Sequence, residues 1–208
     1  MHTLSIGSSL RFGWETFKKR PWFLIGVTAL TIVISWAIGS VAGTFGDKGT
    51  GALLGAIVNI ALSTLLGLGM TTFLLKVHDS VENAKVDDLW NPRPFVSFLV
   101  AQILMMFIIV IGLFLLIVPG IILSLMLIFT PYLIVTRHMG PVAALQESRR
   151  MTRGHKWQLL GLILLVAVIN ILGILCILVG LLITVPVTSL AIVHAFRSIE
   201  RGAAHEAA

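Results

Sequence analysis

The fold is decided by a stretch in which no residue is charged: residues 94–136 read PFVSFLVAQILMMFIIVIGLFLLIVPGIILSLMLIFTPYLIVT. Arg93 precedes this stretch and Arg137 follows it. A helix that crosses a bilayer needs about 20 apolar residues, so the stretch is long enough for two crossings. The run IIVI at residues 108–111 lacks the alternation expected of a barrel strand. The stretch therefore predicts two transmembrane helices.

Three other stretches contain no Asp, Glu, Lys or Arg: residues 21–46, 51–75 and 157–196. By the same length argument, the first two predict one helix each and the third predicts two. We therefore expect an all-α polytopic membrane protein with six transmembrane helices in a single membrane domain, residues 1–208. The six helices would form three hairpins, at about residues 21–76, 94–137 and 157–197.

The composition excludes several classes of protein. Hydrophobic residues make up 57% of the chain, charged residues make up 12%, and the mean hydropathy is +1.01. An ordinary soluble domain has about a quarter charged residues, so a soluble enzyme, a nucleic-acid-binding module and a disordered chain are excluded. The single cysteine, Cys176, excludes an internal disulfide framework and a thiolate metal cluster.

Proline and glycine predict where the hairpins turn. Pro119 and Gly120 would form the tip of the second hairpin, since proline removes a backbone donor and glycine permits a tight turn. In the third hairpin we expect the break between Cys176 and Gly180, with Pro186 inside the sixth helix as a kink.

The distribution of positive charge predicts the orientation. With six crossings, both termini and every Lys and Arg except Lys48 fall on one side of the membrane. The positive-inside rule makes that side cytoplasmic. We expect a multi-pass protein of the cell (inner, cytoplasmic) membrane with both termini in the cytoplasm.

A weak internal repeat predicts short helices before the hairpins. Residues 8–26 and 143–161 can be aligned so that Trp22 meets Trp157 and Gly26 meets Gly161. Each segment leads from a basic stretch through Trp into an apolar run. We expect a short cytoplasmic interfacial helix before each hairpin, and the expected positions are about residues 5–19, 84–91 and 141–153.

The third interfacial helix is the best defined. Pro141 suits a first helical position and Gly154 suits a residue just beyond the helix end. We expect the helix to lie flat on the cytoplasmic leaflet, with Val142 and Leu145 inward and the arginines at headgroup level. The candidate contacts with anionic lipid headgroups or with a partner membrane protein are Arg149, Arg150, Arg153, Lys156 and Trp157. Alternatively, these basic residues only determine topology.

Chemistry within the expected spans is sparse. Apart from His194 near a span end, no ionisable residue lies in them. Asn59, Gln102 and Asn170 are candidates for an intramembrane polar path, or they simply bond neighbouring helices. The histidines show no metal-site spacing, and no catalytic motif is present. We therefore expect no catalytic residues, no metal and no cofactor.

Part of the second half resembles a known group of families. The resemblance is carried by residues 116–125, 130–133, 140–148, 151–154, 157 and 160–161. These segments resemble prokaryotic integral membrane proteins such as the membrane domain found with glycerophosphoryl diester phosphodiesterases and the YciC-like inner-membrane proteins. In the phosphodiesterases the activity lies in a separate soluble domain, which is not present here, so the resemblance implies a fold rather than an activity.

Three functions stay open. The first is a non-catalytic membrane scaffold, or an assembly or lipid-interaction protein. The second is a permease for a small neutral or amphipathic solute. The third is a lipid-modifying membrane enzyme, which needs acidic residues to meet histidines. The acidic candidates are Asp79, Glu82, Asp87 and Asp88, and the histidine candidates are His78, His138 and His155.

Overall fold

The computed structural model describes residues 5–45, 49–90, 92–175 and 180–206 of the chain. Every regular element within these residues is a helix. The elements in chain order are α1 (Ile6–Lys19), α2 (Pro21–Gly43), α3 (Gly49–Asp79), the short 3-10 helix η1 (Val86–Leu89), α4 (Phe95–Leu115), α5 (Ile117–Leu127), α6 (Thr130–Arg137), α7 (Pro141–Met151), α8 (Lys156–Leu175) and α9 (Leu181–Glu206).

Within the described residues, six helical segments are long and apolar enough to cross a membrane. They are Pro21–Gly43, Gly49–Asp79, Phe95–Leu115, Val118–Arg137, Lys156–Leu175 and Leu181–Gly202. The fourth segment combines α5 and α6, and we refer to it as the fourth apolar segment. The predicted all-α class with six long apolar helices is confirmed, and the protein is a polytopic membrane protein.

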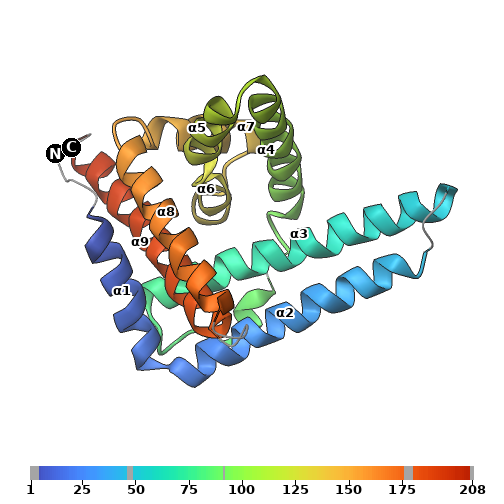
Figure 1. Cartoon of the computed structure of the whole chain (residues 1–208), viewed down its shortest axis with the longest axis horizontal. Coiled ribbons are helices and arrows are strands. Elements are labelled where there is room, and N and C mark those ends of the chain that lie inside the picture. Colours follow the sequence, from blue (N-terminus) through green and yellow to red (C-terminus); the bar gives the residue numbers. More distant parts are fainter. Residues whose placement is uncertain (1–4, 46–48, 91, 176–179, 207–208) are drawn as a thin grey trace.

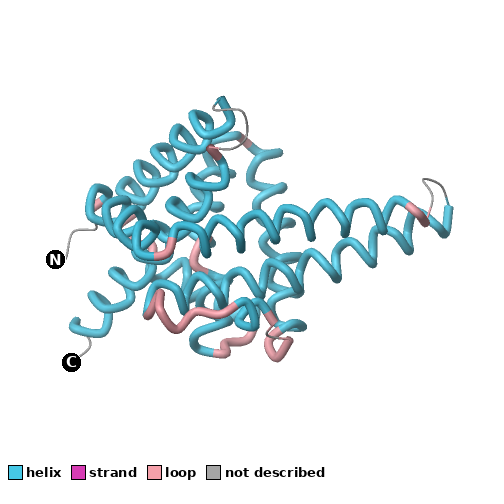
Figure 2. Tube along the Cα trace, turned by 90° about the horizontal axis from the view of Figure 1, so that it is seen from below, coloured by secondary structure: helices cyan, strands magenta, loops and turns pink. Residues whose placement is uncertain are grey.

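Consecutive long helices pack against each other in three pairs: α2 with α3, α4 with α5, and α8 with α9 (Figure 1). The α2–α3 pair projects from the rest of the molecule in two perpendicular views (Figures 1 and 2). A shorter helical element precedes each pair, namely α1, η1 and α7. The short elements and the long pairs therefore alternate along the chain.

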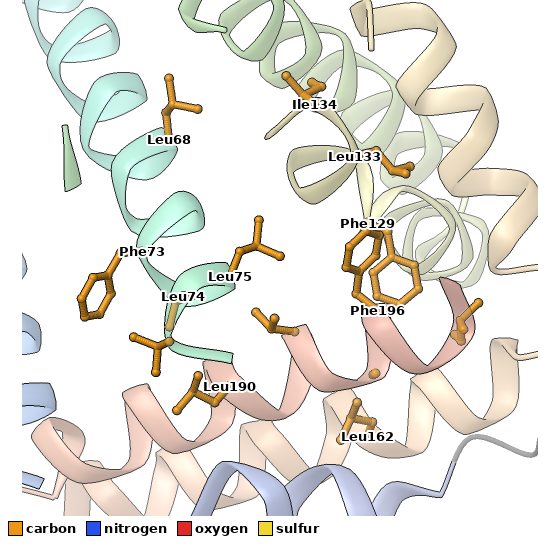
Figure 3. Packing of buried hydrophobic residues seen from close by; sticks show 14 of the residues in the cluster. Leu68, Phe73, Leu74, Leu75, Phe129, Leu133, Ile134, Leu162, Leu190 and Phe196 are labelled. Carbon is orange, nitrogen blue, oxygen red and sulfur yellow. The ribbon is translucent and has the colours of Figure 1, made fainter. Parts of the chain in front are cut away.

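Helix α9 lies at the centre of the packing. Its Leu190, Val193 and Phe196 side chains are fully buried. The ring centroid of Phe196 lies 5.5 Å from that of Phe129, a residue between the end of α5 and the start of α6 (Figure 3). Because α9 also contacts α1, α2, α3, α7 and α8, burial of its apolar side chains joins the three pairs into one core.

The tip of the second hairpin differs from the expectation. Helix α4 ends at Leu115 and α5 begins at Ile117, so the chain turns at Leu116. Pro119 lies in the first turn of α5 instead of at the tip. A proline costs no helical hydrogen bond in a first turn, so the same residue is compatible with either position.

The fourth apolar segment is interrupted in its middle. Helix α5 ends at Leu127, and α6 begins at Thr130 after two residues outside the regular helices. Pro131 is the cause in the sequence, because it has no N–H for the carbonyl of residue 127 and its ring disfavours a straight helix. A separate short helix, α6, therefore follows the break.

Most of the break expected in the third hairpin, residues 176–179, lies outside the described residues. Helix α8 ends at Leu175 and α9 begins at Leu181. Cys176 itself lies outside the described residues. Pro186 is inside α9, as predicted.

Candidate functional site

Helix α7 and the ion pairs that adjoin it form the candidate site. The inner face of α7 is covered by α4, α5 and α6 (Figure 1). The buried residues of that face are Ala144, Leu145, Ser148, Met151 and Thr152.

The orientation expected for α7 therefore needs correction. Leu145 is covered by protein and does not face lipid, whereas Val142 is exposed. An amphipathic pattern gives only the direction of the apolar face, and here protein covers that face.

Ser148 holds α7 against the break in the fourth apolar segment. Its Oγ donates a hydrogen bond to the carbonyl oxygen of Met126 at 2.9 Å and accepts one from the backbone N–H of Phe129 at 3.2 Å. Thr152 Oγ1 lies 3.4 Å from the same Met126 oxygen. The Ser148 hydroxyl therefore bonds both the Met126 carbonyl and the Phe129 N–H. Without it, these two backbone groups would lack the partners that a continuous helix provides.

The outer face of α7 is basic. Arg150 is paired with Glu147 through two hydrogen bonds of 2.8 Å. Arg149 and Arg153 are exposed, and their guanidinium groups have no hydrogen-bond or ion-pair partner among the described residues. Beyond them lie Lys156, half-buried, and Trp157, which is 84% exposed. The charges of Arg149 and Arg153 are thus available to an external anion, whereas the charge of Arg150 is neutralised by Glu147 within the protein.

A chain of ion pairs connects α7 with three other helices. Glu147 accepts from Arg137 at the end of α6, and Arg137 also bonds Glu200 of α9. Glu200 pairs with Arg197, which pairs with Asp79 at the end of α3 at 2.8 Å. The charges alternate along the whole chain, so each residue between its ends has opposite charges on both sides.

The environment of Glu147 lowers its pKa. The hydrogen bonds from Arg150 are the main cause, and the nearby Arg137 charge adds to it. The Glu147 side chain is only 14% exposed, so its pairing is less screened than that of a surface residue. Glu147 is therefore ionised over the neutral pH range and links α6 to α7.

The ion-pair chain ends at two histidines. His78 Nδ1 lies 3.2 Å from Asp79 Oδ1, and His78 Nε2 lies 3.3 Å from His194 Nδ1. Because a carboxylate only accepts, His78 donates to Asp79 from Nδ1, and a neutral His78 ring then accepts at Nε2 from His194. Phe12 of α1 covers both rings, with centroid distances of 4.7 and 4.3 Å. The pair is suited to joining α1, α3 and α9.

Of the acidic residues that could meet a histidine, Asp79 does so. Asp88 instead pairs with Lys76 and accepts from the backbone N–H of Lys85. Within the described residues, no three His, Cys, Asp or Glu side chains gather as metal ligands would. Phe12 packs on the His78 ring, and the His78 side chain is only 5% exposed, whereas the Asp79 side chain is 54% exposed. The imidazole is therefore shielded, and the exposed Asp79 carboxylate is engaged by Arg197.

The polar residues of the apolar helices bond to separate partners. Gln102 accepts a hydrogen bond from Thr64, which joins α4 to α3. Asn170 Nδ2 lies 3.4 Å from Thr188 Oγ1, which joins α8 to α9. The backbone carbonyl of Asn59 accepts from Ser63 within α3. No described hydrogen bond connects Asn59, Gln102 and Asn170 with one another.

Sequence reasoning missed the ion-pair chain and the histidine pair. Arg137 and Glu200 are 63 residues apart, and Arg197 and Asp79 are 118 residues apart. No local spacing connects such residues. The available signal was only that charged residues stand at the ends of four apolar stretches.

Residues 92–205 match the family model described as a domain of unknown function, DUF7847. The chain belongs to this family. The DUF7847 region contains α4 to α8 and nearly all of α9, and therefore both faces of α7. His78 and Asp79 precede it. The match does not name the phosphodiesterase membrane-domain group that the sequence resembles. No curated protein and no solved structure is significantly similar to the chain.

Proposed function

We propose that the protein is a non-catalytic membrane scaffold that binds anionic lipid headgroups through the outer face of α7. In this proposal the termini and α7 lie on the cytoplasmic side of the cell membrane, as the distribution of Lys and Arg favours. The observation that carries the proposal is that the guanidinium groups of Arg149 and Arg153 are exposed and have no partner among the described residues. Trp157 follows them at the start of α8, where an aromatic side chain suits the membrane interface.

The other two functions have less support. A permease needs polar groups that line one path, whereas the Gln102 and Asn170 side chains bond separate partners and no described hydrogen bond joins either of them to Asn59. An enzyme needs an accessible and uncommitted acid or base, whereas the His78 side chain is only 5% exposed and the Asp79 carboxylate is paired with Arg197. A scaffold needs neither feature, and it benefits from the ion pairs that join α3, α6, α7 and α9.

The proposal is tested with three single substitutions on one helical segment: Arg149→Gln, Arg153→Gln and Arg150→Gln. Each basic residue near an anionic leaflet contributes about 1 kcal/mol, which corresponds to a roughly fivefold change in affinity. We expect Arg149→Gln and Arg153→Gln each to weaken phosphatidylglycerol binding by about fivefold. Arg150→Gln should have a smaller effect, because Glu147 already neutralises Arg150. Native mass spectrometry of the detergent-purified chain, titrated with phosphatidylglycerol, measures the affinities. Equal effects of all three substitutions would show that only total charge matters and would refute the assignment.

A further inference from the structure

The break in the fourth apolar segment depends on α7 for its hydrogen bonds. Ser148 bonds the carbonyl of Met126 and the N–H of Phe129 across the interruption. The nearby Thr130 hydroxyl is buried and has no hydrogen-bond partner in the described part of the chain. The break is therefore incompletely satisfied even with α7 in place. Loss of the Ser148 hydroxyl would leave the Phe129 N–H without a partner and the Met126 carbonyl with only the 3.4 Å contact to Thr152.

The two faces of α7 are joined within a single short helix. Ser148 is completely buried and faces the break, whereas its neighbour Arg149 is exposed on the other side. Helices of this length are marginal in water on their own, so α7 depends on its packing against α4, α5 and α6. Undocking of α7 would therefore disrupt the hydrogen bonds of Ser148 with the break and would also remove the fixed arrangement of Arg149 and Arg153.

We propose that α7 is a latch that fixes the break through Ser148 and Thr152, and that an anionic lipid surface bound to Arg149 and Arg153 holds the latch closed. The lipid half of this statement rests on the function proposed above. Docked α7 presents both arginines from an ordered segment, whereas undocked α7 does not. Anionic lipid therefore binds the docked form more tightly and shifts the equilibrium toward it.

The geometry of the fourth apolar segment is then set by the lipid surface. With the latch closed, α5 and α6 are held at their present junction, and Phe129 remains packed on Phe196. With the latch open, the N–H of Phe129 and the carbonyl of Met126 lose the Ser148 hydroxyl. Backbone exchange at residues 126–131 is therefore the direct measure of the latch.

The test uses the full chain in lipid nanodiscs made of phosphatidylcholine alone or of phosphatidylcholine with phosphatidylglycerol. Hydrogen exchange of the peptide that covers residues 126–131 is followed by mass spectrometry. Ser148→Ala should accelerate exchange about tenfold, because a buried backbone donor loses its partner. Ser124→Ala is the matched control, since the Ser124 hydroxyl bonds only the Ile121 carbonyl of its own helix. If Ser148→Ala does not fold, Thr152→Val removes, with little change of shape, the hydroxyl that lies 3.0 Å from Ser148 O and 3.4 Å from Met126 O.

Phosphatidylglycerol should slow this exchange about fivefold or more in the unmodified chain, and the double substitution Arg149→Gln/Arg153→Gln should abolish the difference between the two lipids. Inorganic phosphate added to phosphatidylcholine nanodiscs should have no such effect. If phosphate slows exchange equally, the ligand is a soluble anion and the lipid claim is wrong.

The possible failures are distinguishable. If phosphatidylglycerol binds through Arg149 and Arg153 but leaves exchange unchanged, the coupling is refuted and the proposed function stands. If the arginines do not contribute to lipid binding, the proposed function fails, and the lipid half of the latch proposal fails with it. If Ser148→Ala, or Thr152→Val in its place, exchanges like Ser124→Ala, the latch itself is refuted.

Discussion

Gly13 shows how one residue determines the packing of a helix. It lies on the face of α1 that rests on α9, and a Cβ added there would collide with the Val187 carbonyl oxygen. The same Cβ would lie 3.3 Å from the backbone nitrogen of Ala191. These are main-chain atoms of a buried helix and cannot rotate away, so the absence of a side chain permits this close approach. The approach also places Phe12 of α1 over the histidine pair.

Gly13→Ala should destabilise the protein by about 1–3 kcal/mol, the usual cost of overpacking. Gly7→Ala is the matched control on the same helix, because a Cβ at Gly7 meets nothing within 4 Å. That control should be stabilising by about 0.5–1 kcal/mol, since alanine favours helix more than glycine does. Thermal unfolding of both variants in detergent measures the difference. Equal shifts in the two variants would show that α1 does not pack closely on α9.

At the scale of the helices, the sequence predicted the spans because length without charge is a sufficient physical criterion for them. The prediction of a hairpin tip at Pro119 was wrong, since a proline is compatible both with a loop between helices and with the first turn of a helix. The prediction for α7 failed for a different reason. The pattern around Leu145 indicated an apolar face, but hydrophobicity alone does not distinguish a lipid neighbour from a protein neighbour.

The polar contacts of the site required the three-dimensional structure. Ser148 reads as an ordinary residue of a polar helix, and its role depends on a break that lies 19 residues earlier in the chain. Arg150 and Arg149 are equivalent in the sequence, yet only Arg150 has a carboxylate on its own side of the helix. The candidate arginines were therefore predictable as a group, whereas their division into paired and free residues was not.

The Glu147 carboxyl makes the stability of the α6–α7 junction dependent on pH. Its pKa is lowered in the folded protein, mainly by hydrogen bonding from Arg150. A lowered pKa stabilises the folded state above the unfolded value, about 4.3, and this contribution is lost as the pH falls through the folded value. Glu147→Gln should therefore unfold at a lower temperature than the unmodified chain at pH 7, and the difference should shrink as the pH is lowered below the unfolded pKa of about 4.3.

Melting curves between pH 3 and pH 7 measure this difference. Glu15→Gln is the control, because Glu15 forms an exposed pair with Arg11 on α1. Exposed pairs contribute little, so its melting temperature should follow that of the unmodified chain at every pH. A gap between Glu147→Gln and the unmodified chain that does not change with pH would exclude a role for the Glu147 charge.

At the scale of the whole molecule, apolar surface dominates. Exposed large hydrophobic residues occur along α2, α3, α4 and α8, including both helices of the projecting α2–α3 pair (Figure 2). In water such a surface would promote aggregation, whereas in a bilayer it is satisfied by lipid tails. The ion pairs, by contrast, connect the ends of α3 and α6 with α7 and with the C-terminal half of α9. Charged and apolar regions are thus separated along the helices.

This separation, together with the positive-inside rule, predicts the orientation in the membrane. In a Cys176→Ala background, Val118→Cys near the Leu116 turn should react with a membrane-impermeant maleimide added to intact cells. Lys85→Cys, just before η1, should react only after the membrane is opened. The Lys85 side chain is exposed and lies outside the six apolar segments, so its failure to react in intact cells reports the membrane barrier and not burial. An odd number of crossings between the two positions, here the single crossing by α4, places them on opposite sides of the membrane.

Labelling of both positions in intact cells would contradict a crossing by α4 and overturn the six-helix arrangement. Labelling of Lys85→Cys alone would preserve the crossings and reverse the orientation.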